Sequence, residues 1–147
     1  MKNIWSIICN NSSIDSQTNL LSLFNCVEEM KLEIDKSKMP KSDKIVIPVN
    51  LQLISLWIVD DFLKENTTDI KLELIDPMGK VLNEFFNTLK SRKGDKRLRN
   101  ITNIQGIQIT ESGRYYYRIS QKKGNKFEIV SETPLDINIS FKAIDNR

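Results

Sequence analysis

Alternation of apolar and polar residues with a period of two runs through most of the chain and constrains its fold more than any other feature. The pattern is clearest at 45–58, 70–75, 107–119 and 127–141. Successive side chains of a β-strand point to opposite faces of a sheet, so this period predicts strands with one buried face. The phase changes between Leu53 and Ile54, and we interpret the change as a bulge or bend in a long strand.

Turn residues divide the alternating segments at short spacing. Asp76-Pro-Met-Gly79 has the form of a type I turn, and Gly106, Gly113 and Gly124 punctuate the later segments. Many short strands without alternating helices favour an antiparallel sandwich. The length of 147 residues is that of one ordinary domain, so we expect a single β-sandwich domain over 1–147 with about 7–9 strands.

Two segments fit a helical face as well as a strand. In 20–34 and in 81–90 the apolar residues recur at spacings of three and four. For 20–34 we predict a strand, because the apolar segment 4–9 makes a natural antiparallel partner across a turn at 12–19. Segment 81–90 stays open between strand and helix, so the predicted sandwich has room for one short helix.

The sequence Glu111-Ser-Gly-Arg-Tyr-Tyr-Tyr-Arg-Ile-Ser120 places three tyrosines between two arginines. The spacing from Ile109 to Tyr115 is typical of the tyrosine corner of immunoglobulin-like sandwiches, in which a hydroxyl turns back onto upstream backbone. Tyr117 and Ile119 then share the inner face with Tyr115. Arg114, Tyr116 and Arg118 are predicted on the outer face.

The chain contains no histidine, which narrows the possible chemistry. Histidine-based acid–base catalysis, Ser-His and Cys-His nucleophiles and histidine zinc sites are therefore excluded. No phosphate-binding glycine loop is present. A calcium site built from Asp60, Asp61 and Asp76 at one end of the sandwich is a minor alternative. We expect no catalytic residue, no cofactor and no bound metal, and hence no enzymatic activity.

The segment Lys90 to Arg99 holds six basic residues and one acid, although the formal net charge of the chain is only +3. Such a segment either contacts phosphates with little sequence preference or is a solvated loop between strands. The segment 90–99 and the outer face of the strand that contains Arg114 to Arg118 together supply the candidate contacts for nucleic acid or another partner. These are Lys90, Arg92, Lys93, Lys96, Arg97, Arg99, Arg114, Tyr116 and Arg118.

Cysteine content and apolar run length predict the compartment. Cys9 and Cys26 are too few for a disulfide framework, and we expect each to be a small buried residue in a reducing environment. The apolar runs are too short for a membrane-spanning helix, and the first residues lack the features of an export signal. We therefore expect a cytoplasmic protein that does not bind membranes.

Several motifs taken together resemble a family of small bacterial proteins of unknown function. They are the pattern from Ile14 to Glu29, the LISLW segment at Leu53 to Trp57, the turn at Leu74 to Gly79 and the GRYYYRI strand. The resemblance runs over most of the chain in the same order. It implies an all-β, immunoglobulin-like sandwich and supplies no catalytic residues.

These observations predict a non-enzymatic interaction module whose partner is a protein. The alternative is nucleic-acid binding through the basic loop at 90–99 and the outer Arg/Tyr strand face. The sequence gives no indication of a small-molecule substrate.

Overall fold

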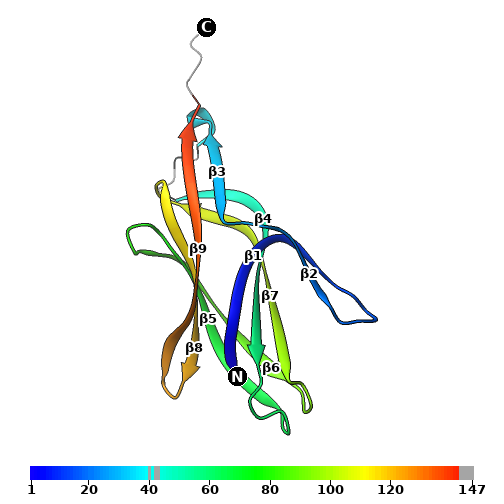
Figure 1. Cartoon of the computed structure of the whole chain (residues 1–147). Coiled ribbons are helices and arrows are strands. Elements are labelled where there is room, and N and C mark those ends of the chain that lie inside the picture. Colours follow the sequence, from blue (N-terminus) through cyan, green and yellow to red (C-terminus); the bar gives the residue numbers. More distant parts are fainter. Residues whose placement is uncertain (40, 42–43, 143–147) are drawn as a thin grey trace.

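The computed structural model describes residues 1–39, 41 and 44–142, which form nine strands and one short 3-10 helix (Figure 1). The strands are β1 (Lys2–Ile14), β2 (Leu21–Cys26), β3 (Glu29–Ile34), β4 (Ile45–Ile58), β5 (Asn66–Ile75), β6 (Val81–Ser91), β7 (Arg97–Ile109), β8 (Gly113–Lys123) and β9 (Lys126–Phe141). The 3-10 helix η1 (Lys36–Lys38) follows β3. The prediction of an all-β chain is confirmed.

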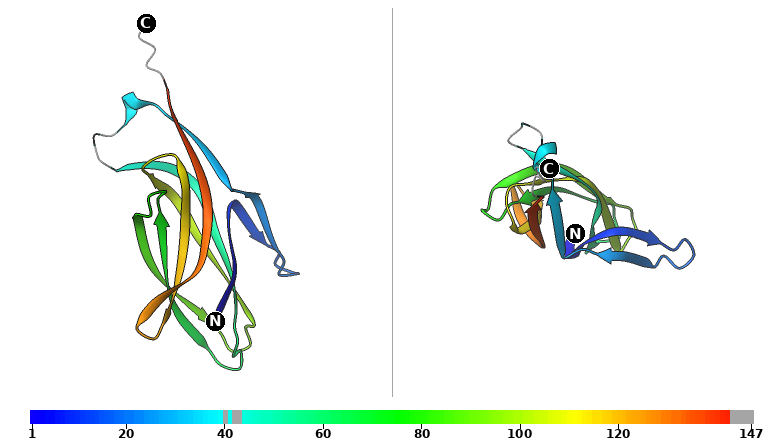
Figure 2. Two further views of the ribbon diagram at one scale, coloured as in Figure 1. Left: turned by 60° about the vertical axis from the view of Figure 1, so that its left-hand side comes forward. Right: turned by 90° about the horizontal axis from the view of Figure 1, so that it is seen from above.

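The strands form two packed sheets, a β-sandwich (Figure 2). One sheet has the order β2-β1-β4-β7, and the other has the order β3-β9-β8-β5-β6. All pairings are antiparallel except that of β3 with β9, which is parallel. The chain passes between the sheets at the β2–β3, β3–β4, β4–β5, β6–β7 and β7–β8 connections.

The core lies between the two sheets and contains large side chains from both. Trp57 of β4, Tyr115 of β8 and Leu135 of β9 belong to one core cluster, and all three are fully buried. The indole Nε1 of Trp57 donates a hydrogen bond of 2.9 Å to the hydroxyl of Ser55, so its polar atom is satisfied. Removal of apolar surface from water at about 25 cal/mol per Å² makes this layer the main stabilising contribution.

Both ambiguous segments are strands. Segment 20–34 contains β2 and β3, as predicted, and segment 81–90 lies in β6. β6 is an edge strand in which Phe85 and Phe86 occupy opposite faces, and this produces the spacing that resembles a helix. The only helix among the described residues is η1, outside both segments.

The predicted bulge between Leu53 and Ile54 is wrong. The pairing of β4 with β7 is continuous through these residues, and its irregularity lies between Pro48 and Leu51. The apolar phase changes because Ile54 is fully buried on the outer face of β4, outside the core cluster. Its register partners Ile7 and Ile101 flank it there.

The connection between β7 and β8 is held by the hydroxyl of Tyr115. This hydroxyl accepts hydrogen bonds from the backbone N–H groups of Thr110 (2.9 Å) and Glu111 (3.2 Å) and donates to the Glu111 carbonyl (2.6 Å). Gly113 follows with φ +151°, and a Cβ there would lie 2.8 Å from a Pro77 side-chain carbon. A close approach between two connections therefore requires glycine at this position.

Within the part of the chain that the structure describes, no helix has the length and apolar character needed to cross a membrane.

Tyr115→Phe is expected to lower the free energy of unfolding by about 1–3 kcal/mol, because it leaves two backbone N–H groups without their acceptor. The measurement is urea denaturation followed by tryptophan fluorescence. Tyr116→Phe, on the outer face of the same strand, is the matched control and should change stability by less than about 0.5 kcal/mol. Equal effects of the two substitutions would contradict the role of the Tyr115 hydroxyl.

The expectation that both cysteines are buried is wrong, since Cys9 is buried but Cys26 is exposed. The two residues are direct partners in the β1–β2 pairing. The Val27 N–H donates to the Ile8 carbonyl, so the neighbouring cysteine pair is a non-hydrogen-bonded one. Burial and, secondarily, the nearby Cys26 raise the pKa of Cys9. Cα atoms in such pairs are about 4.5 Å apart, within the range that a disulfide spans.

Diamide, which takes two electrons and two protons from a pair of thiols, is therefore expected to form a Cys9–Cys26 disulfide within one chain. Mass spectrometry of a tryptic digest under non-reducing conditions detects the linked peptides. Cys9→Ser should abolish the intrachain link, leaving Cys26 as the one reactive thiol. Formation of disulfide-linked dimers alone in the unsubstituted protein would contradict the β1–β2 register.

Candidate functional site

The β1–β2 hairpin extends beyond the sandwich (Figures 1 and 2). Pairing of β1 with β4 ends at Cys9, whereas pairing of β1 with β2 continues to Ile14 opposite Leu21. The Asp15 carboxylate organises the turn by accepting the N–H groups of Gln17 (2.8 Å) and Thr18 (2.7 Å). Hydrogen bonds from Thr18 and Gln17 lower the pKa of Asp15. The tip is thus an ordered two-stranded ribbon outside the main sheet.

Large apolar side chains on this ribbon face solvent. Leu20 is 66% exposed, Phe24 49% and Ile14 45%. None of them belongs to the core cluster. Apolar side chains gathered on one exposed element commonly mark an interaction surface.

The β6–β7 hairpin, the predicted basic loop, is also ordered. The Asp95 carboxylate accepts the backbone N–H of Arg92 (2.9 Å), and its pKa is lowered chiefly by that hydrogen bond. The Gly94 N–H donates to the Phe62 carbonyl (2.7 Å), and the Lys96 ammonium lies 5.2 Å from the centroid of the Phe62 ring. The charged side chains of this loop therefore project from a fixed backbone.

Arg99 brings the two hairpins together. Its guanidinium donates to the side-chain oxygen (3.2 Å) and the carbonyl (2.9 Å) of Asn19 at the tip of the β1–β2 hairpin. Between the hairpins lies a hollow of about 520 Å³. We call the surface around this hollow the hairpin-tip surface; its lining residues are Ile14, Thr18, Asn19, Leu20, Arg92, Asp95, Arg97, Leu98 and Arg99.

β8 holds three of the predicted contact residues, Arg114, Tyr116 and Arg118, and they lie apart from the hairpin-tip surface. β8 begins near Arg114 at the end of the sandwich opposite the basic loop (Figure 1). Arg114 makes a bidentate ion pair with Asp136 (2.7 and 3.0 Å), and Arg118 donates to Glu132 (3.2 Å). Tyr116, half-buried, lies between them. These guanidinium groups already have carboxylate partners, so they are poor ligands for phosphate.

The predicted contact residues therefore divide into two sets. Arg92, Arg97 and Arg99 line the hairpin-tip surface, and Lys90, Lys93 and Lys96 are exposed on the same hairpin or just before it. Ile14 and Leu20 were not predicted as contact residues, because apolar residues in a strand pattern indicate a core position. The only signal was the turn between them, which Asp15 and Asn19 mark as a hairpin tip.

The aspartates considered for calcium are not brought together. Asp60 lies beside the N-terminal amino group, 3.7 Å away, near the start of β5, whereas Asp76 follows the end of β5. Asp76 instead accepts the N–H groups of Met78 (3.0 Å) and Lys80 (2.8 Å) in its own turn. Among the residues described, no group of three potential metal ligands from His, Cys, Asp and Glu is close enough to hold an ion.

Comparison with known proteins gives no relative: no family model matches the chain, and no curated protein matches it either.

The Asp136 carboxylate is expected to titrate below an ordinary aspartate, because the hydrogen bonds and charge of Arg114 lower its pKa. A lowered pKa in the folded state means that the ion pair stabilises the protein above the unfolded pKa of about 3.9. That contribution is lost as the pH falls through the folded pKa. A carboxyl NMR titration measures it, and Arg114→Gln should return Asp136 to the ordinary range. Identical titrations in both proteins would contradict the pairing.

Proposed function

We propose that this protein is a non-enzymatic, immunoglobulin-like interaction module that binds another protein through the hairpin-tip surface. The observation that carries the proposal is that the exposed Leu20 side chain lines the same open hollow as Arg92 and Arg97. The proposal includes a cytoplasmic location, which rests on the low cysteine content alone.

The composition of the surface defines the chemistry of the partner. Ile14 and Leu20 supply apolar contact area, and burial of such side chains at the centre of an interface provides much of its affinity. Arg92 and Arg97 supply positive charge at the rim, opposed by the single carboxylate of Asp95. The complementary surface is an apolar side chain flanked by carboxylates, and the charges accelerate and orient the encounter.

The strand order supports an immunoglobulin-like topology. In such folds the B and E strands pair in one sheet, and the G, F and C strands pair in the other. β4 and β7 occupy the places of B and E, while β9, β8 and β5 occupy those of G, F and C. The hydrogen bonds of Tyr115 at the start of β8 lie at the corner between E and F, where these folds carry a tyrosine corner.

Nucleic acid is the second candidate, favoured by the basic side chains exposed on the β6–β7 hairpin. Phosphate contacts would involve Lys93, Arg97 and their neighbours but would not need Leu20. The paired guanidinium groups of Arg114 and Arg118 do not support this alternative. The two functions therefore predict different responses to substitution at Leu20.

The experiment compares the unsubstituted chain with Leu20→Asp, Arg97→Glu and the control Met78→Glu. Met78 is a highly exposed apolar residue in the β5–β6 turn, away from the hairpin-tip surface. Proteins captured from nuclease-treated host lysate are identified by mass spectrometry, and the strongest is purified for calorimetry. We expect Leu20→Asp and Arg97→Glu each to weaken its binding at least about tenfold, and Met78→Glu to leave it unchanged.

Binding of the purified partner that is unaffected by both hairpin-tip substitutions would overturn the proposal. Labelled single- and double-stranded oligonucleotides are titrated in parallel at low and moderate salt. Salt-dependent binding that is lost in Arg97→Glu but retained in Leu20→Asp would assign the surface to nucleic acid instead.

A further inference from the structure

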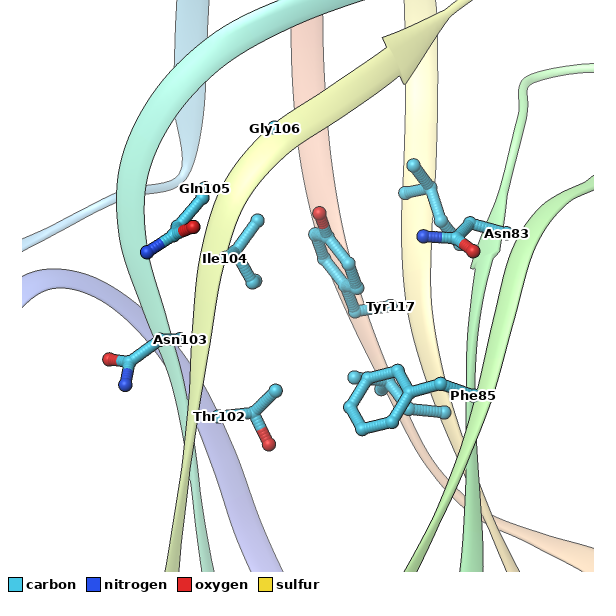
Figure 3. A pocket seen from close by; sticks show the side chains of 10 residues that line it. Asn83, Phe85, Thr102, Asn103, Ile104, Gln105, Gly106 and Tyr117 are labelled. Carbon is cyan, nitrogen blue, oxygen red and sulfur yellow. The ribbon is translucent and has the colours of Figure 1, made fainter.

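A second concave site lies where the two sheets separate. β6 and β7 are consecutive in sequence, but each is the edge strand of a different sheet. Near their connecting hairpin the two strands approach each other, and the side-chain Nδ2 of Asn87 donates a hydrogen bond of 3.5 Å to the Oδ1 of Asn100. Farther from the hairpin a cavity of about 260 Å³ opens between the strands (Figure 3). We call it the β6–β7 cleft.

Apolar side chains form the floor of the β6–β7 cleft, and polar side chains supply a similar share of its lining. Leu72 and Leu74 of β5 and Ile104 of β7 line it, and all three are buried core residues. Phe85 shares the inner face with its register partner Leu72, yet it is 40% exposed. An inward-facing aromatic ring with that exposure shows that the sheets do not close over it, so the ring borders an open site.

The hydroxyl of one largely buried tyrosine opens into this space and has no hydrogen-bond partner among the described residues. Tyr117 is only 5% exposed, and among the described residues none makes a hydrogen bond with its hydroxyl. Figure 3 shows the ring directed into the cleft from β8, between Ile104 and Asn83. Burial raises the pKa of Tyr117, so the hydroxyl stays protonated and is available as a donor. The Tyr117 oxygen is not among the fully buried atoms that lack a partner, so it opens to the cleft, where another molecule can reach it.

Two further polar groups border the cleft. The Thr102 hydroxyl accepts a hydrogen bond of 3.3 Å from the Asn100 side chain and retains its own proton for donation. The Asn83 side-chain oxygen accepts the N–H of Glu84, while its NH₂ group has no partner among the described residues. The cleft thus offers several hydrogen-bond donors around an apolar floor.

Within the described part of the chain, no charged side chain lines the cleft. Its ten lining residues are Leu72, Leu74, Asn83, Phe85, Thr102, Asn103, Ile104, Gln105, Gly106 and Tyr117. An ionised ligand would lose its hydration there without gaining a counter-charge, which is strongly unfavourable. The lining therefore selects for neutral molecules.

We propose that the β6–β7 cleft binds a small uncharged molecule with a ring-sized apolar body and one hydroxyl or carbonyl group that pairs with the Tyr117 hydroxyl. The volume supports this size, since an engineered apolar cavity of about 150 Å³ holds benzene and typical ligand pockets begin near 300 Å³. The site is separate from the hairpin-tip surface, so this inference does not depend on the proposed protein partner.

The test is a titration of the isotope-labelled full chain with phenol, cyclohexanone and indole, followed by amide NMR shifts. Benzoate, which adds a charge to the same ring size, is the negative probe. We expect saturable shifts at residues 83–85 and 102–106 with at least one neutral probe and none with benzoate. Tyr117→Phe should weaken binding of phenol or cyclohexanone about fivefold, as loss of one hydrogen bond predicts.

Two controls separate loss of the hydroxyl from loss of the fold. Tyr116→Phe removes a hydroxyl from the outer face of the same strand and should leave binding unchanged. Tyr117→Phe should leave the stability of the ligand-free protein unchanged or raised, because its hydroxyl has no partner to lose. Ile104→Phe places a larger side chain in the cleft and should abolish binding while the hairpin-tip surface keeps its activity.

Absence of saturable shifts with all three neutral probes would overturn the inference, since the cleft would then hold only water. Equal affinity of phenol and cyclohexanone for the unsubstituted protein and Tyr117→Phe would overturn it as well. So would binding of benzoate as tight as that of phenol.

Discussion

The hydrogen bonds of the Tyr115 hydroxyl hold one of the points at which the chain leaves the four-stranded sheet and enters the five-stranded one, and the orientation of β8 in the sandwich depends on them. With that crossing fixed, Tyr115 and Tyr117 face the core and the arginines of β8 face outward. Thr110 at the same corner also donates to the Asp76 carboxylate (3.1 Å). The β7–β8 and β5–β6 connections are therefore joined by one small network of polar atoms.

Charge is distributed unevenly over the molecule, and this distribution separates structural from interacting surfaces. On the outer face of the five-stranded sheet, Lys71, Arg118 and Glu73 form a mixed network with carboxylates of β6 and β9. Opposite charges there are already neutralised across strands. The hollow beside the β6–β7 hairpin is lined by three arginines and one aspartate, together with apolar side chains of the β1–β2 hairpin. An incoming molecule would therefore find unmatched charge and uncovered apolar area at the same place.

The sequence predicted those features that depend on local periodicity. The strand alternation, the inward phase of Tyr115 and Tyr117 and the strand character of 20–34 all follow from residues close together in the chain. Features that depend on which strands become neighbours were not predictable. The Arg114–Asp136 pair exists because β8 lies beside β9, and the β6–β7 cleft exists because two edge strands from different sheets diverge. Leu20 was missed because a hydrophobicity pattern does not distinguish a covered ribbon from a projecting one.

The position of β9 between β3 and β8 has a consequence for how the chain acquires its structure. Among the described strands, β9 is the only partner of β3, which lies at the edge of the sheet. Its parallel register joins Glu29 to Asp136, contacts of very high sequence separation, which typically slow folding. During synthesis, residues 29–34 leave the ribosome long before residues 126–141 exist, so β3 remains an unpaired strand throughout that interval. Unpaired strands of nascent chains are prone to aggregate, so residues 29–34 carry that risk until β9 has been synthesised.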